Sequence, residues 1–278
     1  MNPSPRREPA TPPPPPTPPR LHLAPWHRPR PVNEVLDLPI AVLVAFVAMN
    51  AFAALVQGTL GFGFAIVSVP FLVLLDPRLA PVPQLLVQVP LCAYLYWRER
   101  RDAEWRGVVW VTVGGVPGTV IGVWLLAVAT GAALDLLNGV LVLGGVAALA
   151  FGLRLKRNVG TETFAGVLSG ISSTVSAMGG PPVALLYEGA RGPTVRATLS
   201  LIFLIGVLLS VVGRLFADDG LLMRDVALTA IASPPVALGL WASRFLTGRV
   251  EGRPMRLGIL GLSALSGLGL VGRAIATW

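Results

Sequence analysis

The chain has 278 residues, of which 54% are hydrophobic and only 13% are charged, and its formal net charge is +8 at neutral pH. A water-soluble protein of this length needs far more polar surface, so the composition excludes that class and indicates a protein surrounded by lipid. The positive charge does not indicate nucleic-acid binding, because the arginines cluster beside long apolar runs, where cytoplasmic loops and anionic lipid headgroups favour them.

Residues 1–37 differ from the rest of the chain. Ten prolines lie between Pro3 and Pro19, and the segment continues as RLHLAPWHRPRP. Such a composition cannot bury a core and predicts a disordered tail with polyproline character. The tail holds both histidines of the chain, so we assign neither of them a catalytic role.

After the tail, the chain is a series of apolar segments separated by short polar gaps. A helix that spans a bilayer needs about 20 apolar residues, and lipid tolerates only helices and closed barrels. The apolar runs are continuous rather than alternating, which predicts an all-α polytopic membrane protein. The predicted segments are residues 38–57, 60–75, 82–97, 107–128, 135–153, 163–178, 180–190, 197–216, 226–245 and 256–276.

The chain also aligns with itself at an offset of 117 residues, which places VTVGGVPGTVIGVW (111–124) on LTAIASPPVALGLW (228–241) without a gap. The same offset pairs Gly63 with Gly180, inside the two short segments that glycine and proline interrupt. We therefore expect a duplicated helical unit of four to five segments with interrupted helices. The predicted repeats are residues 38–158 and 159–278.

Two membrane topologies remain open. If each repeat crosses five times the repeats are inverted, and if the interrupted segments do not cross, each repeat crosses four times and the repeats are parallel. Ten crossings place most loop arginines in the cytoplasm but leave the arginine-bearing tail outside; eight crossings bring the tail inside and expose the groups at 191–196 and 244–256. The positive-inside rule does not decide between them. We favour the inverted arrangement.

The residue types needed for several kinds of chemistry are missing from the apolar segments. No Asp or Glu lies in the middle of one, so no buried carboxylate relay is predicted. The sequence has no HExxH motif, no paired intramembrane aspartate and no P-loop. We expect no enzyme activity, no cofactor, no metal and no direct coupling to ATP. Coupling to protons or sodium ions and the oligomeric state are left open.

The main chain of two breaks, QGTLGFGFAIVSVP (57–70) and SGISSTVSAMGGPP (169–182), is where we expect the chemistry. Glycine lets a main chain leave helical angles and proline removes a donor, so each break should yield half-helices. The N-terminus of a half-helix presents unpaired N–H groups and partial positive charge, which binds an anion without a buried cation. The predicted substrate-binding residues are Gln57, Gly61, Gly63, Pro70, Ser172, Ser173, Ser176, Gly179, Gly180 and Pro181.

Other glycines and arginines have simpler expected roles. Glycine also allows close packing of membrane helices. Arg191 and Arg196 could attract an anion to a pathway mouth, although loop arginines more often mark topology. Arg214, near the end of its segment, is expected to snorkel toward the interface. The packing role is predicted for Gly114, Gly118 and Gly122, which stand four apart.

The segments GTLGFGFAIVSVPFL (58–72) and SGISSTVSAMGGPPVALLY (169–187), with the basic gap YWRERRDAEWR (96–106), resemble the TauE/SafE family of sulfite exporters and anion permeases over residues 42–272. The resemblance implies an inner-membrane permease for sulfite, sulfonates or related organic anions, often serving export. It assigns Gly61, Gly63 and Pro70 to the first family motif and Gly179, Gly180, Pro181 and Pro182 to the second. The first motif here is poorer in glycine than is usual in the family.

We therefore expect a secondary active permease of a bacterial inner, or plasma, membrane that exports a small anion by alternating access between the two repeats. Sulfite, an organosulfonate or a related organic acid would be the solute. Two alternatives remain open. One is a passive anion channel that uses the same helix ends, and the other is a membrane scaffold or assembly protein without transport activity, recruited through its tail.

Overall fold

The structure is a computed structural model that describes residues 38–150, 156–187, 189–216, 222–247 and 253–277. The chain divides into two units, Met1–Arg30 and Pro31–Trp278, and every described residue belongs to the second. The predicted disordered tail, residues 1–37, lies outside the described residues.

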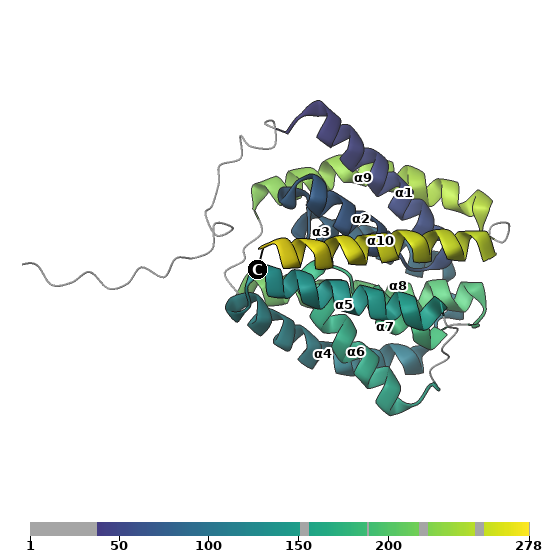
Figure 1. Ribbon diagram of the computed structural model, residues 1–278. Helices are drawn as coiled ribbons and strands as arrows, with labels where there is room; N and C mark the ends of the chain where they lie inside the picture. Colours follow the sequence, from purple (N-terminus) through teal and green to yellow (C-terminus); the bar gives the residue numbers. More distant parts are fainter. Residues whose placement is uncertain (1–37, 151–155, 188, 217–221, 248–252, 278) are drawn as a thin grey trace, which may run out of the picture. The chain divides into compact units, whose positions relative to one another are not determined.

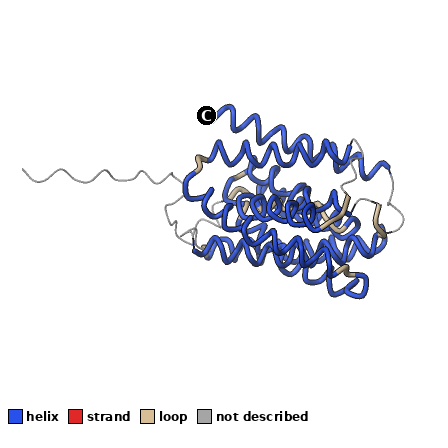
Figure 2. The backbone as a smooth tube through the Cα atoms, turned by 90° about the horizontal axis from the view of Figure 1, so that it is seen from below, coloured by secondary structure: helices blue, strands red, loops and turns tan. Residues whose placement is uncertain are grey.

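The described residues form helices and short turns and contain no strand, which confirms the predicted all-α fold (Figures 1 and 2). The α-helices are α1 (Ile40–Leu60), α2 (Phe64–Leu75), α3 (Val82–Glu99), α4 (Trp105–Val128), α5 (Gly131–Ala150), α6 (Val159–Ser176), α7 (Gly180–Ala184), α8 (Gly192–Phe216), α9 (Met223–Leu246) and α10 (Arg253–Thr277). Three short 3-10 turns are η3 (Pro77–Leu79), η4 (Arg100–Asp102) and η5 (Leu185–Tyr187).

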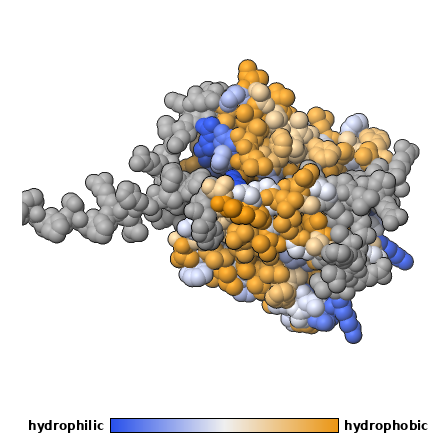
Figure 3. Space-filling view, in the orientation of Figure 1, coloured by the Kyte–Doolittle hydropathy of each residue, from blue (hydrophilic) through white to orange (hydrophobic). Residues whose placement is uncertain are grey.

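The outward faces of the long helices are apolar. On α4, for example, Val120 and Trp124 are 65% and 60% exposed. Figure 3 shows apolar residues covering the sides of the helices, with the strongly hydrophilic residues near the helix ends. Among the described residues, five helical stretches are long and apolar enough to cross a membrane: α1, Pro77–Asp102, α4, α8 and α9. Such surfaces belong in lipid, so the chain is a multi-pass membrane protein.

Polar contacts define one end of the helix bundle. Arg98 on α3 donates to the carbonyl of Gly58 in the last turn of α1, at 3.2 Å. Glu104, just before α4, accepts two hydrogen bonds from Arg157, just before α6, and its N–H donates to Thr198 in α8. The helices α1 and α3 therefore end where α4, α6 and α8 begin. We call this the arginine-rich end, because it gathers Arg98, Arg100, Arg101, Arg106, Arg157, Arg191 and Arg196.

The opposite end is defined in the same way. Arg273 in the last turns of α10 pairs with Asp135 in the first turns of α5, at 2.7 Å. Ser176 at the end of α6 donates to the side-chain oxygen of Asn138 on α5, at 2.8 Å. Arg214, near the end of α8, donates to carbonyls in the last turn of α6. The helices α6, α8 and α10 therefore end where α5 begins.

The helices that the 117-residue offset pairs run in opposite directions between these two ends. The helix α1 finishes at the arginine-rich end, where its counterpart α6 starts, and α3 finishes where α8 starts. The helices also pack between the two halves of the chain. The helix α4 packs along α6 and α9 packs along α1, while α3 contacts α8 and α5 contacts α10. This is the arrangement that two inverted repeats would produce.

Glycine allows the two closest helix contacts. A Cβ added to Gly114 or Gly118 on α4 would lie 1.9 Å or 2.3 Å from a carbonyl oxygen of α6, and one at Gly122 would lie 2.8 Å from Thr174. A Cβ added to Gly239 on α9 would lie 2.2 Å from a carbonyl oxygen of α1. The predicted packing role of the glycines on α4 is confirmed, since any larger residue would push α4 away from α6.

Candidate functional site

The first break separates α1 from α2 and is held by Gln57. Gly61 ends α1 at φ 87° and Gly63 precedes α2 at φ 112°, a left-handed backbone that favours glycine. The side-chain oxygen of Gln57 accepts from the N–H of Phe64 at 3.0 Å, and its amide donates to the sulfur of Cys92 at 3.4 Å. Gln57 thus ties the end of one half-helix to the start of the next.

The start of α2 keeps two further donors. A helix leaves its first N–H groups without intrahelical partners. Among the described residues no acceptor takes the N–H of Ala65 or of Ile66, which follow Phe64 in the first turn. The aligned peptide dipoles add about half a positive charge at this terminus. The first break therefore offers a donor-rich, electropositive helix end.

The second break is chemically different. The helix α6 ends at Ala177, which takes a left-handed φ of 64°, and Ser169 donates to the carbonyl of Gly179 at 2.7 Å. The helix α7 then has only five residues, and Pro181 and Pro182 occupy its first turn. Proline has no N–H. The two breaks thus differ as donors, because two residues in the first turn of α7 have no N–H group, whereas the first turn of α2 contains no proline.

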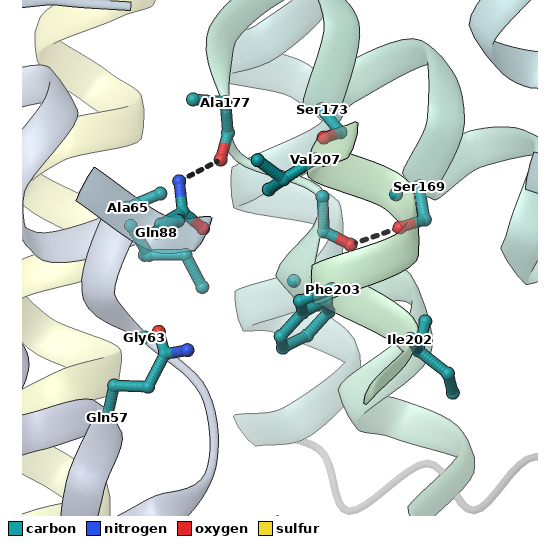
Figure 4. Close-up of a pocket in the computed structure, with 14 residues that line it drawn as sticks. Gln57, Gly63, Ala65, Gln88, Ser169, Ser173, Ala177, Ile202, Phe203 and Val207 are labelled. Carbon is teal, nitrogen blue, oxygen red and sulfur yellow. Dashed lines mark hydrogen bonds between the residues drawn. The ribbon is translucent and has the colours of Figure 1, made fainter. Parts of the chain in front are cut away.

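A pocket lies between the two breaks. Figure 4 shows Gln57, Gly63 and Gln88 on one side and Ser169 and Phe203 on the other. The pocket is narrow, with about 20 Å³ open to the centre of a water molecule; one water needs roughly 10–15 Å³ by that measure. A guest of a few heavy atoms is the most it can hold in this conformation. The lining residues are Gln57, Gly63, Ala65, Ile66, Gln88, Ser169, Ser173, Ala177, Gly179, Gly180, Ile202, Phe203, Gly206 and Val207.

The lining is neutral and mixes polar and apolar side chains. Gln88 donates to the carbonyl of Ala177 at 3.4 Å, a long bond that joins α3 to the second break. Ser173 accepts a hydrogen bond from Ser210 at 3.0 Å. Ile202, Phe203 and Val207 of α8 add apolar surface on the side of Ser169 and Ser173, across from Gln57 and Gln88 (Figure 4). An anion here would meet amide groups on one side, and hydroxyl groups and hydrocarbon on the other.

Five of the predicted substrate-binding residues lie outside the lining. Gly61 packs on α8, where an added Cβ would lie 2.7 Å from the Cα of Arg196. Ser176 bonds Asn138, and Pro181 packs against Gly145 on α5. Pro70 lies inside α2, and the carbonyl of Ser172 accepts from Ser176. The residues that do line the pocket are Gln57, Gly63, Ser173, Gly179 and Gly180.

Gln88, Ser169 and Phe203 line the pocket although the sequence analysis did not select them. A signal for Gln88 was present: Gln84 and Gln88 stand four apart in the apolar run VPQLLVQVP, and polar residues inside membrane segments are candidates for functional sites. Gln84 accepts a hydrogen bond from Ser68 of α2 at 3.1 Å, and this bond anchors α2 to α3. No comparable signal marked Phe203.

Arginines cover the carbonyl end of α1 beside the pocket. Arg98 donates to Gly58, and Arg196 donates to the carbonyl of Thr59 at 3.3 Å while its Nε pairs with Glu99 at 2.8 Å. Arg196 is only 4% exposed. Cations at a helix C-terminus offset the negative end of the helix dipole. The negative end nearest the pocket is therefore neutralised.

The end of α6 is covered in the same way. Arg214 donates to the carbonyl of Thr174 at 2.8 Å and to that of Val175 at 2.9 Å, and it is 5% exposed. The expectation that Arg214 snorkels was wrong, because the unpaired carbonyls of α6 hold it inside the bundle. Gly58 and Val175 are 117 residues apart, so repeat-related carbonyls receive an arginine at both breaks.

Comparison with known protein families identifies a family that covers most of the chain. The family described as Sulfite exporter TauE/SafE matches residues 45–270, a range that includes both breaks and every lining residue of the pocket. No curated protein and no solved structure matches the chain. The match confirms the resemblance drawn from the two glycine and proline motifs.

Proposed function

The chain belongs to the sulfite exporter TauE/SafE family of membrane transporters, and we propose that it exports a small anion by secondary active transport across a bacterial inner membrane. The observation that carries the proposal is the neutral pocket between the two breaks. The donor-rich start of α2 forms part of its lining. Sulfite, an organosulfonate or a related organic acid is the proposed solute.

Electrostatics favours an anion over a cation in this pocket. The start of α2 contributes partial positive charge, and the negative ends of α1 and α6 are neutralised by Arg98, Arg196 and Arg214. No acidic side chain lines the pocket to attract a cation. The sulfur-bound oxygens of sulfite or a sulfonate would accept from the N–H and hydroxyl groups. The apolar side chains of Ile202, Phe203 and Val207 would suit a short hydrocarbon substituent.

We propose that transport proceeds by alternating access between the two repeats, 38–158 and 159–278, in inverted orientation. Because α4 packs on α6 and α9 on α1, the moving bodies would be two repeat-related bundles that have exchanged α4 and α9. The narrow pocket suits an occluded stage of such a cycle. The positive-inside rule then places the arginine-rich end in the cytoplasm, with ten crossings.

The test is a flux panel on purified protein in liposomes. Sulfite, short organosulfonates and carboxylates would be offered with and without an imposed proton or sodium gradient, and protein-free liposomes are the control. Saturable uptake of one anion class, driven above its equilibrium level by one of the gradients, is the expected result. Uptake that never exceeds equilibrium would indicate the passive channel, and no uptake of any anion would indicate the scaffold.

A further inference from the structure

A second hollow lies between α3 and α9, and the residues of α3 that line it do not line the polar pocket. It offers about 440 Å³, against about 20 Å³ for the polar pocket. Val87 and Leu91 of α3 and Val236 and Leu240 of α9 line it, so its surface is almost wholly apolar. We call it the α3–α9 groove. A space of this size and polarity does not suit a small anion.

The sequences of the two helices account for the groove. Pro90 lies inside α3, and Pro234 and Pro235 lie inside α9. A proline within a helix removes a hydrogen bond and prevents regular packing of the turn before it. The residues facing the space from α9 include Ser233 and Ala237, whose small side chains cannot fill it. The groove is thus built into the sequence on both of its walls.

The length of the groove matches one leaflet of a bilayer. On α9 the lining runs from Ser233 to Arg244, a distance of roughly 16 Å at 1.5 Å per residue. The hydrocarbon of one leaflet is roughly half of the 30 Å core, or about 15 Å deep. A lipid chain that follows α9 from the interface would therefore reach the end of the groove near the middle of the membrane.

The rim of the groove carries a cation. Arg244 lies over the ring of Tyr94, 5.7 Å from its centroid, and donates to its hydroxyl. Arg244 is exposed, and no carboxylate pairs with it among the described residues. Tyr94 is on the last turns of α3, so both residues stand at the arginine-rich end. A guanidinium has five donors and binds phosphate in a two-pronged fashion.

From the apolar walls, the leaflet-deep length and the cationic rim, we propose that the α3–α9 groove binds an anionic phospholipid. One acyl chain occupies the groove between Val87 and Leu240, and the headgroup phosphate is bound by Arg244. This site is separate from the anion pocket and does not depend on which solute the protein carries. It would hold the lipid in the leaflet at the arginine-rich end, where anionic headgroups are attracted to cationic residues.

The test uses the full-length protein in detergent, washed and then incubated with phosphatidylglycerol or phosphatidylcholine of identical acyl chains. Native mass spectrometry counts the lipid retained per chain. The wild type should keep one phosphatidylglycerol in preference to phosphatidylcholine. Arg244→Gln should lower that preference about five-fold by removing one interfacial cation. Ala237→Phe, which places a ring in the groove, should lose both lipids.

Matched controls accompany each variant. Arg106→Gln removes an exposed arginine on α4, at the same end of the bundle. Leu238→Phe places the same ring on Leu238, which follows Ala237 but is 66% exposed and does not line the groove. Both controls should retain lipid as the wild type does. Unchanged retention in Ala237→Phe, or an unchanged lipid preference in Arg244→Gln, would overturn the proposal. The proposal would also be overturned if the wild type were a dimer and Ala237→Phe made it a monomer without changing the lipid count. In that case a second copy of the chain, and not a lipid, would occupy the groove.

Discussion

The two breaks are related by the 117-residue offset that pairs Gly63 with Gly180, but their chemistry differs. Both follow a helix whose last carbonyls accept from a buried or half-buried arginine, and both contribute glycines to one pocket. Only the first, however, leads into a 12-residue helix with free N–H groups; the second leads into a five-residue helix that opens with two prolines. The comparison teaches that a shared backbone geometry need not give a shared ligand role. We infer that α2 holds the anion and that α7 shapes the pocket.

The largest effects are expected from the two repeat-related glycines. Gly63→Leu forces a branched side chain onto a φ of 112°, and the Cβ at Gly180 would lie 3.3 Å from Ile66, so Gly180→Leu fills the pocket. Both should reduce liposome flux to background while the protein still inserts. Gly63→Leu should also lower thermal stability, by about 1–3 kcal/mol for backbone strain, whereas Gly180→Leu adds no such strain because Gly180 has no positive φ.

A matched control for both glycines is Gly144→Leu on α5, because Gly144 is exposed and an added Cβ there meets nothing within 4 Å. It should transport like the wild type. Normal flux in Gly63→Leu and Gly180→Leu would remove the pocket from the transport path.

The next largest effect concerns Gln88, which joins α3 to the second break from inside the pocket. Gln88→Glu would place a carboxylate beside the solute; two like charges about 4 Å apart repel by about 4 kcal/mol at an effective dielectric of 20. Anion flux should fall at least about tenfold, and Gln88→Leu should cost less. An unchanged or higher anion flux in Gln88→Glu would contradict the sign of the proposed solute.

The hydrogen bonds that hold the two breaks should differ in how much they contribute to the free energy of unfolding. Gln57→Leu leaves the buried N–H of Phe64 without its acceptor, which costs about 1–3 kcal/mol. Ser169→Ala removes one hydroxyl bond to Gly179, with a cost of about 1 kcal/mol. Thermal unfolding in detergent and the solute concentration at half-maximal flux measure the two effects. Equal losses in the two variants would remove the distinction between the breaks.

The smallest effect is expected from restoring a donor to the second break. Pro182→Ala returns an N–H to the first turn of α7. One added neutral hydrogen bond is worth about 0.5–1.5 kcal/mol, so the apparent affinity should change by no more than about tenfold. Pro70→Ala, which changes a proline inside α2 and away from the pocket, is the control. A loss of all transport in Pro182→Ala alone would assign α7 the ligand role that we give to α2.

Much of the fold could be predicted from the sequence, because lipid imposes strong rules. Continuous apolar runs predicted the helices, and the glycine and proline motifs located the first break at Gly61–Gly63. The second break was predicted at Gly179–Pro182, and the structure has it slightly earlier, at residues 177–179 between α6 and α7. The offset that pairs Gly63 with Gly180 also pairs the helices that run in opposite directions. These features depend on residues close together in the chain or on a periodicity that spans it.

The make-up of the pocket was harder to predict, because it depends on which face each helix turns inward. Gln88 bonds Ala177 across 89 residues, and nothing near either residue in the sequence indicates that contact. Gly61 looked equivalent to Gly63 but packs against Arg196, while Arg214 is held inside the bundle by carbonyls of α6. Long-range packing decided each of these outcomes.

The exchange of α4 and α9 between the halves has a consequence for biosynthesis. The helix α1 leaves the ribosome early, yet the glycine face it packs against belongs to α9, which ends 186 residues after α1 (246 minus 60). At roughly 5–20 residues per second, that partner arrives about 10–40 s later. During the interval, lipid or the insertion machinery must cover the face of α1 that later packs on α9. A ribosome that stalls before α9 would release an N-terminal half in which that face has no helix packed on it.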